Sequence, residues 1–286
     1  GGGAKLMSVF NTVTTIDAAT VERSDTMSRN AILAVSFGTI YAETREQTIG
    51  AIEQTMRETF PGWDVKRALT SPTILRKLAA AGEPMQNVWQ ALGQLREEGV
   101  SRVVCQSTYV VNGEEQEAMV RETEKYAHWF DQIVCGAPLL TAQEDFEAVA
   151  DAIETEFTTL SPEEVLVLMG HGTKHSANTA YAALDYVFKD HGAHNIFVGT
   201  VDTYPSILSV LRRVESIQPK KIILAPLMVV AGDHARNDMA GDKNSWRAAF
   251  EERGYPVQTV LKGLGEYPGI RAVYAAHAQR AAERLI

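Results

Sequence analysis

Two histidines and an aspartate each follow an apolar run in the second half of this 286-residue chain. His171 follows "EVLVLM" and lies between two glycines, Asp202 follows "NIFVGTV", and His234 follows "KIILA" after a short loop. Imidazoles and carboxylates bind divalent first-row metals, and they also accept protons from a substrate. These residue types therefore predict a metal site or an acid–base site, provided that the fold brings the three chain segments together.

The elements that must position these residues are alternating strands and helices. Apolar runs rich in β-formers predict strands at 31–37, 102–106, 133–135, 164–169, 195–201, 221–225 and 257–261. Apolar residues at helical spacing predict helices over 43–60, 204–216 and 267–285. Continuous apolar strands that alternate with helices are typical of parallel sheets covered on both faces. We therefore predict an α/β fold, in which ligands bind beyond the carboxyl ends of the strands.

Two sequence signatures occur twice, in the same order. The stretch 34–48 "AVSFGTIYAETREQT" resembles 167–181 "VLMGHGTKHSANTAY", and 107–119 "STYVVNGEEQEAM" resembles 226–239 "PLMVVAGDHARNDM". Ordered repetition of this kind predicts two similar α/β halves.

The repeats also suggest domain boundaries. We expect an N-terminal extension or tag over 1–30 and an N-terminal domain over 31–140, with a last helix at 267–286 packing back on it. A C-terminal domain over 141–266 then carries the candidate metal ligands. Residues 1–30 contain no apolar segment of the signal-peptide type, so we expect a cytoplasmic protein. A periplasmic protein whose signal has been cleaved is the alternative.

Composition excludes some classes of partner. The net charge is −9 and the pI is about 5.3, which disfavours nucleic acid, because phosphate binding requires a basic surface. No stretch approaches the roughly 18 apolar residues of a membrane span. The sequence also lacks the GxGxxG and GxxxxGK[ST] patterns of nucleotide sites.

Simpler roles for the same residues stay open at this point. A histidine after a strand is often hydrogen-bonded within the structure, and Asp202 also suits a helix N-cap before "TYPS". His171 in "GHG" also suits the general base of a metal-free hydrolase. Three ligand types at the ends of three strands nevertheless favour a functional site.

Several longer segments resemble the anaerobic sirohydrochlorin cobaltochelatase family, the class II chelatases. They are "VSFGTIYAETR", "TSPTILRKL", "CQSTYVVNGEE", "GAPLL", "LMGHGTKHSANTAYAALDYV", "GTVDTYPS", "APLMVVAGDHARNDMAGDKNSWR" and "GLGEYPGIRAVYAAH". The resemblance covers nearly everything from Ala31 to His277. It implies a chelatase fold with two Rossmann-like domains of parallel sheet, a tetrapyrrole cleft between them, and Co²⁺ insertion into sirohydrochlorin without ATP.

The resemblance also implies roles for individual residues. His171 and His234 match the two metal-binding histidines of the family, and Asp202 stands where the family usually has glutamate. Tyr109 stands where relatives commonly carry a histidine, near which some members hold haem, and tyrosine also ligates haem iron.

We expect four residues to bind the tetrapyrrole in the cleft. They are Phe37, Gly38, Thr39 and Tyr109. Arg45, Lys174 and Arg236 are candidates for steering the carboxylates of the substrate. We also expect a homo-oligomer. The alternatives are insertion of Fe²⁺ by a ferrochelatase-type enzyme that makes sirohaem or haem, and a non-enzymatic carrier of tetrapyrrole or metal.

Overall fold

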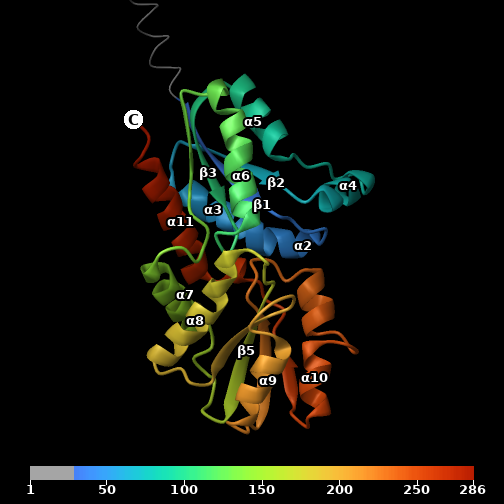
Figure 1. Cartoon of the computed structure of the whole chain (residues 1–286). Helices are drawn as coiled ribbons and strands as arrows, with labels where there is room; N and C mark the ends of the chain where they lie inside the picture. The colour runs from blue at the N-terminus through green and yellow to red at the C-terminus, as the bar shows by residue number, and fades with distance from the viewer. Residues whose placement is uncertain (1–28) are drawn as a thin grey trace, which may run out of the picture.

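The computed structural model describes residues 29–286, which form alternating strands and helices (Figure 1). The elements of the first half are β1 (Arg29–Ser36), α2 (Ala42–Arg45), η1 (Glu46–Gly50), α3 (Ala51–Thr59), β2 (Asp64–Leu69), α4 (Pro72–Ala80), α5 (Val88–Glu97), β3 (Val100–Ser107), α6 (Glu114–Lys125), η2 (Ala127–Trp129) and β4 (Gln132–Cys135). The elements that follow are α7 (Gln143–Glu156), β5 (Glu164–Gly170), η3 (Ser176–Asn178), α8 (Thr179–Asp190), β6 (Ile196–Thr200), α9 (Ile207–Glu215), β7 (Lys221–Pro226), η4 (His234–Met239), α10 (Trp246–Glu252), β8 (Val257–Thr259), η5 (Leu264–Glu266) and α11 (Pro268–Ala282).

The strands form two separate parallel sheets with the same topology. The strand order is β2-β1-β3-β4 in the first sheet and β6-β5-β7-β8 in the second, and every neighbouring pair is parallel. The two sheets lie one above the other in Figure 1, the first in blue to green and the second in yellow to red. The predicted α/β fold with two similar halves is confirmed.

Both faces of each sheet are covered, as the apolar runs predict. Six of the eight residues of β1 and six of the seven residues of β5 are buried, so alternate side chains on both faces must have apolar neighbours. On one face of each sheet lies a helix with an apolar stripe, α5 in the first half and α9 in the second. The opposite faces share one continuous core with α3, α7, α8 and α11.

β2 is the one strand among the described residues that apolar runs did not predict. It is an edge strand with the sequence "DVKRAL", and only Ala68 and Leu69 are buried. Its Arg67 forms ion pairs with Glu46 and Glu53, at 3.0 and 2.8 Å. An edge strand with one wet face does not need an apolar run, so its sequence carries a weaker signal.

The last helix returns to the first half of the chain. α11 packs against α3 and along β3 and β4, and it lies beside the first sheet in Figure 1. The Tyr274 hydroxyl lies within hydrogen-bond distance of the carbonyl oxygens of Thr108 and Tyr109, at 3.0 and 2.9 Å. α7 packs instead beside α8 of the second half and against α11. Most of the extension expected over 1–30 lies outside the described residues, but Arg29 and Asn30 already belong to β1.

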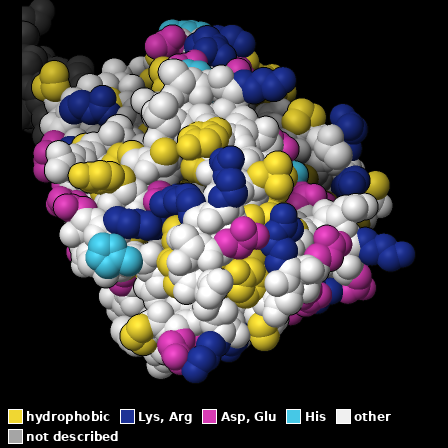
Figure 2. Space-filling model, turned by 60° about the horizontal axis from the view of Figure 1, so that its bottom comes forward, with side chains coloured by type: hydrophobic (Ala, Val, Ile, Leu, Met, Phe, Trp, Pro, Cys, Tyr) yellow, Lys and Arg dark blue, Asp and Glu magenta, His cyan; other side chains and the backbone are white. Residues whose placement is uncertain are grey.

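The surface at the far end of the second half has mixed character. In Figure 2, Lys and Arg side chains there are interspersed with Asp and Glu and with small hydrophobic groups. Within residues 29–286, no helix is both long and apolar enough to cross a bilayer.

Candidate functional site

The loops that follow β1, β3, β5 and β7 meet between the two sheets and enclose a cavity of about 590 Å³. This place lies at the carboxyl ends of the central strands, where parallel α/β sheets bind ligands. Both halves contribute to the wall, which combines apolar groups with a few polar and titratable side chains. Prominent among these are Thr39, Tyr109, Glu114, Glu115, His171, Tyr181, Asp233 and His234.

His171 and His234 face each other across the cavity. Their Nε2 atoms are 3.1 Å apart, and their ring planes are nearly perpendicular at 88°. Nδ1 of His234 lies 2.6 Å from Oδ2 of Asp238, and Nδ1 of His171 lies 3.1 Å from the carbonyl oxygen of Gly172. Because these oxygens accept hydrogen bonds, each Nδ1 carries the proton and each Nε2 presents a lone pair. Two lone pairs this close repel each other unless a proton or a cation lies between them.

This geometry suits a divalent metal ion. Two nitrogen ligands at about 2.0–2.1 Å from a tetrahedral ion lie roughly 3.3 Å apart, close to the observed separation of the two Nε2 atoms. A carboxylate behind the imidazole, such as Asp238 behind His234, is the arrangement that orients metal-binding histidines. The His171 and His234 side chains are 51% and 46% exposed, so an ion can reach them from solvent.

The two glycines beside His171 have separate structural reasons. At Gly170 a Cβ atom would lie 2.4 Å from the buried ring of Tyr181, so only glycine fits at the end of β5. Gly172 has a φ of +88°, a conformation that other residues rarely adopt. The pair allows the chain to leave the sheet and turn sharply, which places the His171 ring at the cavity wall.

Asp202 lies next to His171 but on the other side of its ring. Its Oδ2 atom is 3.8 Å from Nδ1 of His171, whereas His234 faces Nε2. Asp202 does not line the cavity, and its side chain is 58% exposed. Within the described part of the chain, the three ligands expected from the sequence therefore do not converge on one point.

A different carboxylate lies inside the cavity. Glu115, at the start of α6, lines the wall together with both histidines. Its side chain is exposed at the cavity surface, but the surrounding protein desolvates the carboxylate and raises its pKa above the usual value. The nearby His171 partly offsets that shift of the Glu115 pKa. The sequence contained a signal for Glu115, because the repeated loop places it where the second half has His234.

All four residues expected to bind the tetrapyrrole line the cavity. Phe37 is half exposed, and Gly38 has a φ of +106°, which again requires glycine. Tyr109 is buried, its hydroxyl lies 3.0 Å from Oγ1 of Thr70, and burial strongly raises its pKa. These groups form an apolar wall opposite the histidines.

Hydrogen bonds between the two halves flank the cavity. The Tyr41 hydroxyl donates to Oδ1 of Asp233 at 2.7 Å, and Arg236 stacks over the Tyr41 ring at 4.0 Å. His175 lies 2.8 Å from Glu117 and forms a second connection. These contacts fix the spacing of the two walls.

The three cations suggested for steering have other surroundings. Arg236 is occupied at the junction of the halves, because besides stacking on Tyr41 it donates to Oγ1 of Thr44 at 3.2 Å. Arg45 is buried, donates to the Thr39 carbonyl and pairs with Glu83. Lys174 is exposed and does not line the cavity.

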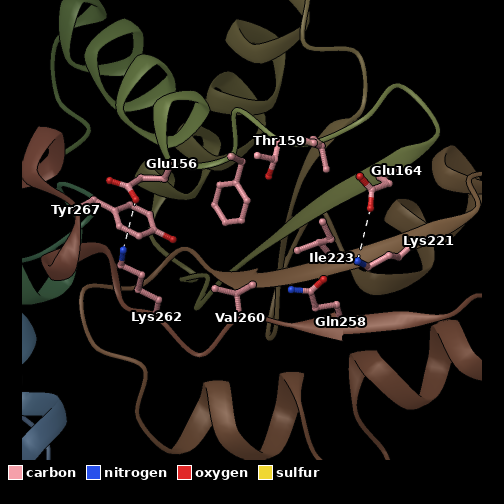
Figure 3. Close-up of a pocket in the computed structure, with 11 residues that line it drawn as sticks. Glu156, Thr159, Glu164, Lys221, Ile223, Gln258, Val260, Lys262 and Tyr267 are labelled. Atoms are coloured by element: carbon pink, nitrogen blue, oxygen red, sulfur yellow. Dashed lines mark hydrogen bonds and ion pairs between the residues drawn. The ribbon is translucent and has the colours of Figure 1, made fainter.

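A second cavity, of about 350 Å³, lies far from the histidines on the second sheet (Figure 3). Its lysines are both paired, Lys221 with Glu164 at 3.6 Å and Lys262 with Glu156 at 3.4 Å, and no histidine lines it. Elsewhere, Asp151, Glu154 and His191 bring three ligand atoms within 4.8 Å of one another on the surface of α7 and α8.

Comparisons with known proteins identify the family of this chain. Residues 30–283 match the family described as Cobalt chelatase (CbiK). The chain is 38% identical over 255 residues to a protein of Salmonella typhimurium named sirohydrochlorin cobaltochelatase. This alignment covers 88% of this chain and 96% of the relative. It is 32% identical over 263 residues to the sirohydrochlorin cobaltochelatase CbiKC of Nitratidesulfovibrio vulgaris, covering 91% of this chain and 93% of that protein.

Solved structures show the same fold at low sequence identity. SirB from Bacillus subtilis with Fe³⁺ superposes with a TM-score of 0.61 and 13% identity, over 89% of this chain and 96% of SirB. CbiX, described as the terminal enzyme for biosynthesis of siroheme in denitrifying bacteria, superposes with a TM-score of 0.52 and 16% identity, over 88% of this chain and 99% of CbiX.

Proposed function

This chain belongs to the cobalt chelatase (CbiK) family, and we propose that it inserts Co²⁺ into sirohydrochlorin at the cavity between its two halves. The observation that carries the proposal is the pair of Nε2 atoms of His171 and His234, 3.1 Å apart in a cavity that apolar side chains also line. A metal ion needs the first feature and a flat macrocycle needs the second.

Co²⁺ binds first, to the Nε2 atoms of His171 and His234. A carboxylate completes the protein ligands, and two residues are candidates for it. Glu115 lies in the same cavity as both rings, whereas Asp202 requires a rotation of the His171 ring or a shift of its own loop. Among residues 29–286 neither carboxylate lies close enough to both rings to complete the ligand set, so either one must move. We favour Glu115 because it shares the cavity with both rings, with Asp202 acting on the Nδ1 side of His171.

The exchange reaction must also move two protons. The four ring nitrogens of sirohydrochlorin replace the protein ligands of the metal, and the two pyrrole N–H groups lose their protons. With H₂L as metal-free sirohydrochlorin, the balanced reaction is Co²⁺ + H₂L → CoL + 2 H⁺. Each imidazole that releases the metal regains a basic lone pair at Nε2. Glu115 is a second acceptor, because its raised pKa makes it a stronger base than an ordinary glutamate. The resemblance to the class II chelatases implies that this reaction proceeds without ATP.

Haem fits the described residues less well than the substrate does. Iron would bind Tyr109 as a phenolate, but burial raises the pKa of this tyrosine and its hydroxyl is hydrogen-bonded to Thr70. We therefore assign Tyr109 to the cavity wall.

Three further predictions from the sequence are kept as proposals. They are the domain division at 140/141, the homo-oligomer and the cytoplasmic location.

Replacing His234 with Ala tests the proposal. We expect cobalt insertion into sirohydrochlorin, followed by absorbance, to fall by more than about a hundredfold, because one of two imidazole ligands is lost. His194→Ala is the matched control, since this exposed histidine lies away from the cavity, and it should keep full activity. Wild-type rates in the His234 variant would overturn the site, and faster insertion of Fe²⁺ than Co²⁺ by the wild-type protein would make it a ferrochelatase-type enzyme.

A further inference from the structure

The helix α4 is an addition to the first half of the chain. In the second half, the chain passes from β6 to α9, which covers the sheet, through the short segment 201–206. In the first half, the corresponding passage from β2 to α5 takes residues 70–87 and includes α4. Because α5 and α9 occupy equivalent faces of the two sheets, α4 has no counterpart.

α4 contributes little to the core but has a fixed position. Only Leu78 of its nine residues is buried, and the helix stands to the side of the first half in Figure 1. Its start is capped by the Ser71 side chain, which accepts from the backbone N–H of Ile74 at 3.2 Å. The loop after it is tied down by the ion pair between Glu83 and the buried Arg45. A helix that adds little to the core yet is anchored at both ends is expected to serve another purpose.

That purpose is indicated by where α4 lies. Its N-cap and three of its residues line the histidine cavity, namely Ser71, Thr73, Ile74 and, in the last turn, Lys77. Lys77 is the only Lys or Arg among the residues that line this cavity. Lys77 is exposed, and no carboxylate among residues 29–286 lies within ion-pair distance of it.

The other charged side chains that line the cavity are mostly acidic, so the unpaired Lys77 differs from its surroundings. Glu114, Glu115 and Asp233 line the wall, and the whole chain carries a net charge of −9. Tetrapyrroles of the sirohydrochlorin type carry many carboxylates, which such a wall repels. Only the edge of the cavity formed by α4 offers them a positive charge.

On the basis of the proposed function, we infer that Lys77 binds a peripheral carboxylate of the tetrapyrrole and thereby sets the orientation of the ring in the cavity. The Thr73 hydroxyl, one turn earlier on the same wall, is placed to share that carboxylate. Lys77 acts on binding and orientation rather than on the metal, because the histidines lie on loops of the other half.

Lys77→Met and Arg76→Met form a matched pair that tests this inference. The two residues are neighbours on α4, but Arg76 contacts Thr73 at 3.4 Å and does not line the cavity. We expect Lys77→Met to raise the KM for sirohydrochlorin about three- to tenfold with kcat changed less than about twofold. Arg76→Met should leave both constants unchanged, and Lys77→Arg should restore most of the affinity.

Added salt provides a second readout. The KM of the wild-type protein should rise with ionic strength more steeply than that of Lys77→Met, because the lost contact is electrostatic. Equal KM values and equal salt dependence in the two methionine variants would overturn the inference. If the wild-type protein inserts no cobalt, the proposed function fails, but fluorescence titration with metal-free sirohydrochlorin still compares the affinities of the two variants.

Discussion

The loops after β3 and β7 follow a similar backbone path but carry different functional side chains. In both, the strand end makes the same pair of hydrogen bonds to a later segment. These are Leu139 N–H to Tyr109 O and Leu140 N–H to Val110 O in the first half, and Leu264 N–H to Met228 O and Gly265 N–H to Val229 O in the second. This correspondence makes Glu115 in the first half equivalent in position to His234 in the second half. One copy of the loop therefore presents a carboxylate to the cavity where the other presents an imidazole.

The loops after β1 and β5 differ in the same way. Thr108 N–H donates to Val35 O and Leu227 N–H donates to Met169 O, at 2.9 and 2.8 Å, which aligns Phe37 with His171. The first half thus supplies an aromatic wall and an acid, and the second half supplies both imidazoles. Two halves of similar fold therefore form a cavity with chemically different sides, one suited to a flat ring and the other to a metal ion.

The largest expected effect comes from erasing this asymmetry at His171. With His171→Phe, the second half receives the residue of the first, and we expect cobalt insertion to fall at least about a thousandfold. The melting temperature should change little, because the ring is half exposed. Insertion assays and circular dichroism melts check both points. Activity within tenfold of wild type would show that the two loops are chemically equivalent after all.

Glu115→Gln tests whether the acid of the first half is used, and we expect insertion to fall about ten- to a hundredfold. Asp202→Asn is the comparison and should cost less than about threefold, because Asp202 lies outside the cavity. The reverse order of the two effects would assign the carboxylate ligand to Asp202.

The pH dependence of Glu115 gives a second measurement. Its pKa is raised in the folded protein, so the ionised form that binds metal is lost at a higher pH than for an ordinary glutamate as the solution is acidified. The acid limb of kcat/KM should therefore change in Glu115→Gln. A raised carboxyl pKa also means that ionisation costs stability, a cost absent below the unfolded pKa and fully present above the folded one. At neutral pH the variant should thus be as stable as wild type or more so, and a loss of stability would indicate a structural role.

A moderate effect is expected from the support behind His234. In Asp238→Asn, the charged acceptor of the Nδ1 proton, 2.6 Å away, becomes a neutral amide. We expect cobalt affinity to fall roughly tenfold, without loss of the fold. Cobalt titration followed by visible absorption checks this value. An unchanged affinity would show that the His234 ring does not need a charged partner to bind cobalt.

The repeats and apolar runs predicted seven of the eight strands and the two-fold repetition of the fold, because buried parallel strands require continuous apolar residues. The apolar runs did not predict β2, because one face of this edge strand is exposed to solvent. The candidate site was predicted in part. His171 and His234 meet in the cavity, but the place of the carboxylate was not readable from the order of the strands.

The sequence by itself determined which residue types follow each strand, and therefore that two imidazoles would lie at the carboxyl ends of one sheet. Only the tertiary structure shows which carboxylate shares the cavity with them. Asp202 and Glu115 both follow strand ends, but a side chain acts on the atom that it faces. Asp202 faces the Nδ1 side of His171, whereas packing of the first half against the second brings Glu115 into the cavity, a contact between segments 56 residues apart that no local pattern encodes.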